Sequence, residues 1–352
     1  MMEIGIDSFA AVLPDPTTGK MPRPVDRLAN LIEEVEVADQ VGLEVFGIGE
    51  HHRAEFLDSA PAIILAAVAA RTKTIRLTSA VTVLSAADPV RVFQEFATLD
   101  LISQGRAELV VGRGSFAEAY PLFGFQLSDY DALFAEKLDL LLNIRDNPQV
   151  RWSGRYRPPL TGQGIYPRPL QERLPVWLGV GGTPQSFARA GTLGLPLMVA
   201  IIGGDYERFR PLVDLYREAG RRAGHPPQAL RVGIHAIGFV AETTAAAKDA
   251  FFPGWAHMFT TIGRERGWSA ATRGQFEAMC GPGGAFLIGD PQTVADKMLR
   301  ASRTLGGVSR MTFQMSSASL EHEAMKRSIA LLGREVAPIV RQAIGGEGQP
   351  HG

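Results

Sequence analysis

The chain has 352 residues, of which 45% are hydrophobic and 21% charged; this composition excludes a disordered or fibrous protein and supplies a large core. Its 36 basic and 37 acidic residues give a formal charge of −1 without like-charge runs, which argues against nucleic acid or an anionic membrane as partner. A single cysteine, Cys280, excludes an internal disulfide. The N-terminus lacks a secretory pattern, so we expect a cytoplasmic protein.

Short β-rich runs alternate with segments of helical period along the whole chain, which is the pattern of a parallel α/β fold. The predicted strands are 3–9, 44–49, 75–81, 107–112, 175–180, 196–201, 231–241 and 309–315. The predicted helices are 25–40, 60–71, 89–103, 129–146, 184–193, 206–223, 243–260, 292–305 and 319–335. Eight strands with intervening helices favour a closed (β/α)8 TIM barrel, with an open doubly wound sheet as the alternative.

We predict one barrel domain over residues 1–340 and a disordered tail over 341–352. Residues 152–175 contain too many prolines and glycines for a helix and predict a hairpin or extended insertion. A second, glycine-rich insertion is expected over 262–289, after the seventh strand and its helix. In barrels of this kind the active site lies at the C-terminal ends of the strands, so the loops there are where chemistry is expected.

The second predicted strand ends in Glu50, His51 and His52. A metal site needs three or four convergent ligands, and adjacent histidines of an extended segment point to opposite sides, which disfavours a metal. A histidine at a barrel mouth, with an ordinary pKa near ~6.5, suits proton transfer around neutral pH. A solvated strand end without chemistry is the remaining alternative.

The fifth strand leads into Gly181, Gly182 and Thr183, followed by Pro184 at the expected first position of a helix. Helix N-termini expose unpaired N–H groups, and glycines let a phosphate approach the backbone closely. Thr183 can cap the helix and offer its hydroxyl. The turn therefore predicts a phosphate cradle, with a merely tight connection as the alternative.

Two further mouth segments complete the set of candidates. Strand four ends in Gly112, Arg113 and Gly114, where an arginine suits an anion by bidentate pairing or is a plain surface residue. The third strand and the turn after it, 78–89, carry small and β-branched side chains, which either leave room for a flat ligand or only pack the barrel.

Three segments together resemble the luciferase-like flavin monooxygenases, which include bacterial luciferase. They are GLEVFGIGEHH (42–52), the run from RTKTIRL to GRG (71–114), and VWLGVGGTPQSFARAGTLGLPLM (176–198). The resemblance extends from residue 3 to about 338. It implies a (β/α)8 barrel with an insertion near strand seven, reduced flavin mononucleotide (FMN) as cosubstrate, molecular oxygen, and a separate flavin reductase.

The resemblance makes His51 the counterpart of the family's catalytic histidine, with Glu50 and His52 as support. It matches Ala80 and Val81 to a cis peptide bond beneath the flavin ring. It also matches Gly181, Gly182 and Thr183 to the phosphate turn and Arg113 to an arginine near the phosphate. Bacterial luciferase departs from this chain where it has cysteine at Gly112, serine at Gly181, and a second arginine near Asp131.

The resulting hypothesis is a monooxygenase in which oxygen adds at the flavin C4a carbon and the peroxide attacks a small organic substrate. His51 would assist proton transfer, and the loops at 10–24 and 262–289 would exclude water. A deazaflavin-dependent hydride-transfer enzyme and a non-catalytic flavin-binding protein are the alternatives.

The organic substrate is not specified by these motifs, and an apolar pocket is one reading of the mouth aromatics. Its candidate lining is Phe9, Phe46, Phe116, Phe123, Phe125 and Trp177. Relatives are commonly dimers or tetramers, and the apolar helices at 60–71 and 89–103 predict a homodimer that buries them.

Overall fold

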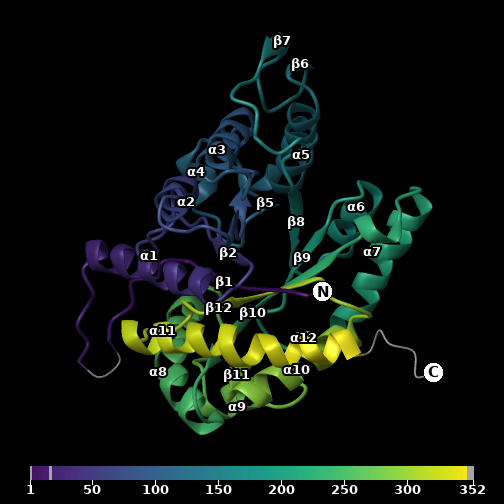
Figure 1. Ribbon diagram of the computed structural model, residues 1–352. Helices are drawn as coiled ribbons and strands as arrows, with labels where there is room; N and C mark the ends of the chain where they lie inside the picture. Colours follow the sequence, from purple (N-terminus) through teal and green to yellow (C-terminus); the bar gives the residue numbers. More distant parts are fainter. Residues whose placement is uncertain (1, 16–17, 347–352) are drawn as a thin grey trace, which may run out of the picture.

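Eight parallel strands form the barrel of the computed structural model, which describes residues 2–15 and 18–346 (Figure 1). Its strands are β1 (Glu3–Ser8), β2 (Val45–Ile48), β3 (Arg76–Ser79), β5 (Leu109–Gly112), β8 (Val176–Val180), β9 (Leu197–Ala200), β10 (Val232–Val240) and β12 (Arg310–Gln314). A parallel bridge between Leu77 and Ala107 joins β3 to β5 and completes the ring. The short β4 (Thr82–Val83) continues β3 and pairs with β5. The (β/α)8 prediction and all eight predicted strands are confirmed.

Helices pack around the barrel, and most of them begin where the sequence places a proline or a capping side chain. The major helices are α1 (Pro24–Gln40), α2 (Pro61–Ala69), α3 (Pro89–Ile102), α5 (Tyr130–Asp146), α6 (Pro184–Thr192), α7 (Arg210–Arg222), α8 (Thr244–Glu265), α10 (Pro291–Thr304) and α11 (His322–Leu331). Proline suits a first helical turn because its missing N–H would be unpaired there anyway. Asp88 adds a side-chain cap, accepting from the N–H of Val90 at 2.8 Å.

Two insertions leave the barrel. An antiparallel hairpin of β6 (Gln149–Trp152) and β7 (Leu160–Gly164) stands away from the other elements in Figure 1, where the proline-rich stretch predicts a hairpin. The 262–289 insertion is more ordered than its glycine content suggests. It holds α9 (Arg273–Cys280), which begins with a Thr272–Gln275 capping box, and β11 (Leu287–Gly289), which pairs with β10.

The C-terminal segment differs from the predicted tail. After α11 a π-helical turn (Leu332–Val336) leads into α12 (Ala337–Gly346), so residues 341–346 are helical. Arg341 explains the extension, because it binds the carboxylate of Glu44 and the carbonyl of Gly42 at 3.2 Å, and Ile344 packs on the main core. Residues 347–352 of the predicted tail lie outside the described residues.

The core lies between the barrel and its helices, and polar groups concentrate inside the barrel. Phe46 of β2 and Leu31 of α1 belong to one continuous apolar cluster between the two layers. Inside the barrel, charged residues lie at the N-terminal ends of the strands, which we call the lower end, and histidines lie toward the C-terminal ends, at the mouth. The two ends therefore differ in the polar groups that they contain. Among the described helices, none is long and apolar enough to cross a membrane.

Candidate active site

His51 lies just beyond the C-terminal end of β2 and is held by a buried carboxylate. Its Nδ1 is 2.8 Å from Oδ2 of Asp58, and its backbone N–H donates to Oδ1 of the same residue at 3.1 Å. Asp58 is fully buried, and burial raises the pKa of its carboxyl although the hydrogen bond from His51 opposes that shift. Two contacts to one carboxylate fix the imidazole, and Nε2 has no hydrogen-bond partner among the described residues.

Aromatic rings enclose the imidazole on its remaining sides. The centroid of the His51 ring is 4.5 Å from that of Phe9, 4.6 Å from that of Phe56 and 5.4 Å from that of Phe116. Side-chain exposure of His51 is only 10%. The imidazole is therefore a rigid group in a mostly apolar setting, with a small opening toward solvent.

His52 points away from His51, as expected for adjacent residues of an extended segment. Its Nε2 is 3.3 Å from Oε1 of Glu50, and its ring meets Phe123 edge-on at 5.0 Å. The other oxygen of Glu50 accepts the backbone N–H of Val83 at 2.8 Å. Glu50 thus ties His52 to β4.

The Ala80–Val81 peptide bond is cis, which confirms the geometry implied by the resemblance. The side chain of Val81 projects toward two strands that carry glycine at the contact. A Cβ on Gly112 would lie 2.7 Å from Val81, and one on Gly179 would lie 2.6 Å away. Glycine at both positions is therefore required by the close packing around Val81.

The Gly181–Thr183 turn leads directly into α6 and is open. No described atom lies within 4 Å of a Cβ built on Gly181 or Gly182. Thr183 is the N-cap residue, yet its side chain makes no capping hydrogen bond within the described part of the chain. The N-terminus of α6 therefore retains free backbone N–H groups and a partial positive charge, which fits an anion such as a phosphate.

Arg113 lies beside this turn, as the sequence predicts. Its guanidinium donates to the hydroxyls of Thr183 at 3.3 Å and Ser186 at 3.2 Å. The same guanidinium binds the carboxylate of Asp131 and lies over the ring of Tyr130 at 4.8 Å. The cation is thus positioned for a phosphate, while Asp131 neutralises part of its charge.

Arg53 connects the mouth loops above His51. It binds Glu55, Glu118 on the loop after β5, and Glu265 at the end of α8 at 2.7 Å. Hydrogen bonds that Arg53 donates, first those to Glu265, raise the pKa of Arg53. Arg53 and Arg266 both lie over the Phe116 ring, with their guanidinium carbons 5.1 and 5.0 Å from its centroid.

Loop residues from the N-terminal segment join this cover. Leu13 and Ala11 pack in one cluster with Phe56, Met258 of α8 and Ile262. A bridge between Ala11 and Phe56 fixes the start of the loop. The first residues of each predicted loop, at Ala11, Leu13 and Ile262, therefore lie at the mouth, and positions 16 and 17 lie outside the described residues.

The predicted aromatic lining is wrong as a single pocket. Phe9 and Phe116 contact His51, but Phe46 faces α1 and Trp177 lies deep in the barrel beneath Arg310, whose guanidinium is 4.2 Å from its ring. Phe123 is half exposed against His52. Phe125 packs instead under the ammonium of Lys137, at 3.7 Å.

Sequence reasoning missed several residues that shape the site: Asp7, Phe56, Asp58 and His235. Asp58 follows His51 by seven positions, in a segment without helical or strand periodicity. An aspartate directly after two apolar residues, Phe56 and Leu57, and close to a mouth histidine is the one signal available for it.

A cavity of about 420 Å³ lies on the other side of the first loop, between that loop and the beginnings of α1 and α11. None of the predicted site residues lines it, so the candidate site is the mouth and not this cavity. Among the described residues, no three histidine, cysteine or acidic side chains gather as metal ligands would.

The fold and mouth geometry define a (β/α)8 barrel protein with a histidine–aspartate pair and an open glycine turn at a helix N-terminus on one rim. Comparison with known families then identifies the chain: the luciferase-like monooxygenase family matches residues 2–308, and the protein belongs to that family. The family supports a monooxygenase, hence an oxidoreductase.

Two bacterial monooxygenases are similar to this chain in sequence. The chain is 26% identical to 4-hydroxyprotoasukamycin monooxygenase of Streptomyces nodosus subsp. asukaensis, over 87% of this chain and 85% of that one. It is 30% identical to N-acetyl-S-alkylcysteine monooxygenase of Bacillus subtilis over 56% of this chain. That second alignment spans 58% of the relative's length.

Solved structures share the fold. The monooxygenase RslO1 of Streptomyces bottropensis superposes with a TM-score of 0.82 at 22% identity, covering 96% of this chain and 99% of that one. The oxygenating constituent of 3,6-diketocamphane monooxygenase from Pseudomonas putida, in complex with FMN, gives 0.77 at 19%, covering 97% and 99%. The coenzyme F420-dependent tetrahydromethanopterin reductase of Methanopyrus kandleri gives 0.72 at 18%, covering 96% and 99%.

Proposed function

We propose that this protein is a flavin-dependent monooxygenase that uses reduced FMN and O2 to oxidise a small organic substrate. The observation that carries the proposal is convergence on one rim. The His51–Asp58 pair at the end of β2 and the open Gly181–Thr183 turn at the end of β8 flank the same cis Ala80–Val81 segment. A flat, phosphorylated ring suits that arrangement.

The residues present fit FMN. Gly181, Gly182 and Thr183 would hold its phosphate with main-chain donors, aided by Arg113. Ala80 and Val81 present small side chains on which the ring system would rest, and Gly112 leaves room for Val81 beneath it. The bound reduced flavin supplies the electrons that activate O2 for transfer of one oxygen atom to the substrate.

The residues of this chain would then do two things: transfer a proton at His51 and exclude water from the mouth. Ionised Asp58 accepts hydrogen bonds only, so it keeps a proton on Nδ1 of His51 and leaves Nε2 to take or give a proton at the mouth. Glu50 and His52 hold the backbone of this segment in place. Arg53 and Phe116 keep the mouth loops closed, which excludes bulk water.

The test is the His51→Ala variant, assayed with photoreduced FMN, O2 and a panel of aldehydes and sulfonates. Oxygenated product should fall about 10²-fold or more while FMN affinity changes little, because proton transfer by a positioned side chain contributes about that much. The O2 that the variant consumes should appear as hydrogen peroxide instead of as oxygenated product. The control is His225→Ala, whose imidazole lies away from the mouth and bonds the carbonyl of Thr192. Unchanged product yield in His51→Ala would refute the role.

Deazaflavin-dependent hydride transfer is the second candidate, favoured by F420-dependent chains among the fold relatives. Titration of the purified protein with FMN and with the deazaflavin, each followed by absorbance, separates the two. Oxygen uptake with reduced FMN supports the monooxygenase. A protein that binds FMN but consumes no oxygen beyond the free-flavin rate, with any substrate of the panel, would be the non-catalytic flavin binder.

The proposed protein partner is a separate flavin reductase, as in the family that the motifs resemble. Catalysis should then proceed with photoreduced FMN alone. With NADH or NADPH and oxidised FMN, turnover should require added reductase. Turnover from NAD(P)H without it would contradict this partner.

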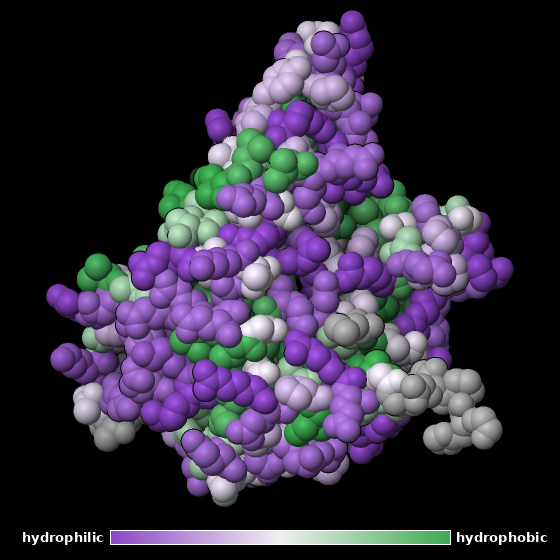
Figure 2. All heavy atoms as spheres, viewed as in Figure 1, coloured by the Kyte–Doolittle hydropathy of each residue, from purple (hydrophilic) through white to green (hydrophobic). Residues whose placement is uncertain are grey.

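We also propose a homodimer through α2 and α3. Figure 2 shows hydrophobic atoms gathered over α2 to α4, where Ile63, Leu101 and Ile102 are 73%, 45% and 50% exposed. Burying such a patch against its own copy would remove apolar surface from water. Light scattering of the wild type and of an Ile63→Asp, Leu101→Asp double variant tests it. A monomeric wild type excludes the dimer.

A further inference from the structure

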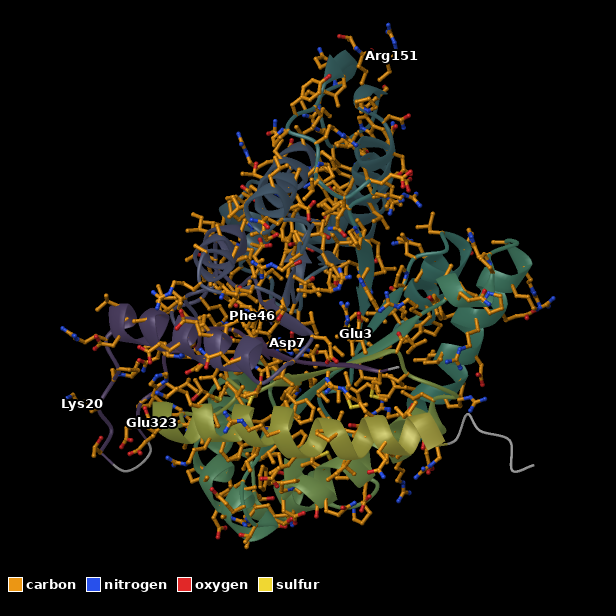
Figure 3. The ribbon with its side chains drawn as sticks, viewed as in Figure 1. Glu3, Asp7, Lys20, Phe46, Arg151 and Glu323 are labelled. Atoms are coloured by element: carbon orange, nitrogen blue, oxygen red, sulfur yellow. The ribbon has the colours of Figure 1, made fainter. Side chains whose placement is uncertain are left out.

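A second histidine–aspartate pair lies inside the barrel, below the mouth. Nδ1 of His235 on β10 is 2.5 Å from Oδ2 of Asp7 on β1, and the hydroxyl of Thr312 on β12 binds the same oxygen. Asp7 is 2% exposed and His235 is 8% exposed. Figure 3 labels Asp7 toward the mouth end of β1 and Glu3 at the opposite end of that strand.

The geometry determines where the proton of His235 lies. An ionised carboxylate only accepts hydrogen bonds, so Asp7 takes one from the Thr312 hydroxyl and one from Nδ1–H of the imidazole. Nε2 then carries a lone pair, and it has no hydrogen-bond partner among the described residues. Because 10% of the side chain remains exposed, this acceptor is not sealed into the core.

The two imidazoles share one ring between them. Phe9 lies 4.5 Å from His51 and 5.9 Å from His235, the latter nearly stacked at 21°. His51 has the same arrangement as His235: Nδ1 on a buried aspartate and Nε2 without a partner in the described chain. Both imidazoles therefore contact the apolar ring of Phe9, with His235 deeper in the barrel.

Strand β2 makes room for both pairs. Asp7 is in register with Gly47, and a Cβ on Gly47 would overlap the carboxylate of Asp7. A Cβ on Gly49 would lie 2.5 Å from Oδ2 of Asp58 and 2.6 Å from Phe9. Gly47 and Gly49 therefore each leave room for one aspartate. Because the two glycines are two residues apart, in β2 and directly after it, His51 lies one layer above His235.

We propose that His235 is a second imidazole of the same active site and that its Nε2 accepts a hydrogen bond from a hydroxyl group of the substrate. The substrate class is an apolar molecule that carries a phenolic or alcoholic hydroxyl, because the neutral imidazole held by Asp7 offers an acceptor and the neighbouring Phe9 offers an apolar face. This inference rests on the proposed function for the location of the substrate.

Phenol is the probe, with toluene as the control of equal size that lacks the hydroxyl. In full-length protein labelled with 15N-histidine, the spectrum should show the proton of His235 on Nδ1. Saturating phenol should shift the Nε2 resonance of His235, and toluene should not. The resonance is assigned by its loss in His235→Asn. Absence of the phenol shift, or an equal shift with toluene, overturns the proposal.

Two variants separate recognition from packing. In His235→Asn the amide can still bind Asp7 but Nε2 is gone, so the roughly tenfold preference for phenol over toluene expected of one hydrogen bond should vanish. In His235→Gln the amide oxygen reaches the former Nε2 position, so part of the preference should return. The opposite order would mean that His235 only anchors Asp7 and would overturn the proposal.

Asp7→Asn provides an independent readout. An amide at this position offers its NH2 to Nδ1, which moves the proton to Nε2, so a phenol hydroxyl must accept a hydrogen bond instead of donating one. Because a phenol hydroxyl donates more strongly than it accepts, the phenol preference should fall in a folded protein, and an unchanged preference overturns the assignment. FMN affinity measured on the same samples keeps the two hypotheses apart. If the wild type binds phenol through His235 but no FMN, the proposed function fails alone; if it binds FMN without the phenol preference, only this inference fails.

Discussion

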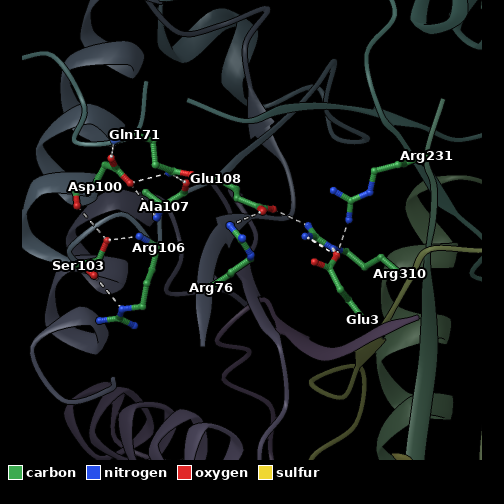
Figure 4. Close-up of polar contacts among 10 residues, drawn as sticks. All are labelled: Glu3, Arg76, Asp100, Ser103, Arg106, Ala107, Glu108, Gln171, Arg231 and Arg310. Carbon is green, nitrogen blue, oxygen red and sulfur yellow. Dashed lines mark hydrogen bonds and ion pairs between the residues drawn. The ribbon is translucent and has the colours of Figure 1, made fainter. Parts of the chain in front are cut away.

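Each end of the barrel contains an arginine bound to several glutamates, and the two arginines differ in what surrounds them. At the N-terminal ends of the strands Arg310 is 1% exposed and binds Glu3 at 2.8 Å and Glu108 at 2.7 Å (Figure 4). At the mouth Arg53 has a side-chain exposure of 9%, but its partners Glu118 and Glu265 are 38% and 54% exposed.

The difference is in the elements that the charges join. Arg310 links strand beginnings of β12, β1 and β5, so its charge is sealed inside the barrel and fixes strand positions. Arg53 links a loop and a helix end whose carboxylates remain in contact with water. Ion pairs of the first kind are costly to break, whereas those of the second kind contribute little to stability. The buried ion pairs of Arg310 therefore stabilise the lower end of the barrel. The ion pairs of Arg53 join mouth segments that can separate at little cost.

Arg310→Met should give the largest effect. It leaves Glu108, which is 2% exposed, without its buried partner, and the free energy of unfolding should fall by about 3–5 kcal/mol. The control is Arg76→Met, which removes a second partner of Glu108 at 3.0 Å whose side chain is 40% exposed, with an expected loss of about 1 kcal/mol or less. Urea unfolding measures both. Equal losses would remove the distinction between the ends.

Asp58→Asn should separate activity from stability at the mouth. The amide turns its NH2 toward Nδ1 of His51 and moves the imidazole proton to Nε2, so product formation should fall about 10–10²-fold with little change in FMN affinity. The free energy of unfolding at pH 7 should stay the same or increase, because a buried charge is removed. Oxygen and product assays, with denaturant unfolding in parallel, test both parts. A strong loss of stability would make Asp58 a structural residue.

The pH dependence of the same variant has a definite sign. Burial raises the pKa of Asp58 above its unfolded value of 3.8, so in the window between the two values the folded state binds more protons. Wild-type stability therefore gains a contribution from Asp58 as the pH falls through the folded pKa, and loses it as the pH rises. The difference in unfolding free energy between Asp58→Asn and wild type should consequently shrink toward pH 4. A difference that widens on acidification would contradict the burial argument.

Much of the site follows from the sequence because parallel strands all end on one rim. The strand ends at His51, Arg113 and Gly181–Thr183 could be placed together without knowing any tertiary contact. The depth of a side chain within the barrel could not be predicted in the same way. Trp177 lies only two positions before Gly179, yet at about 3.3 Å per residue this places it well below the mouth, against Arg310.

Partners that meet across the barrel were equally invisible. Asp7 and His235 are 228 positions apart. His235 is the one polar residue of an apolar strand, and Asp7 is one of three polar residues in its strand. Only the strand register brings them together, with Asp7 opposite Gly47 and His235 opposite Thr312. Asp58 could not be paired with His51 either, because the turn that returns it to the imidazole has no periodic pattern.

Arg53→Met should have a smaller effect that appears in function. The free energy of unfolding should fall by no more than about 1 kcal/mol, because its partners are exposed. Release of the loop at Glu118 and the end of α8 at Glu265 should admit water and raise the share of O2 that leaves as hydrogen peroxide. Peroxide and product are measured together, with Arg222→Met, an arginine 75% exposed on α7, as control. Unchanged coupling would mean that Arg53 does not hold the mouth closed.

Asp131→Asn should give the smallest effect and the one opposite in sign. Asp131 is 72% exposed and pairs with Arg113, which also binds Thr183 and Ser186 at the N-terminus of α6. Removing the carboxylate frees the guanidinium for a phosphate, so FMN should bind about 2–5-fold more tightly, as expected for about 0.5–1 kcal/mol of exposed electrostatics. The gain should shrink at high salt, because screening weakens exposed charges. Asp214→Asn, which removes a carboxylate 50% exposed on α7, should leave FMN affinity unchanged. Flavin fluorescence titrations at low and high salt measure these affinities, and weaker binding in Asp131→Asn would show that Asp131 orients Arg113 toward the turn instead of competing with the phosphate.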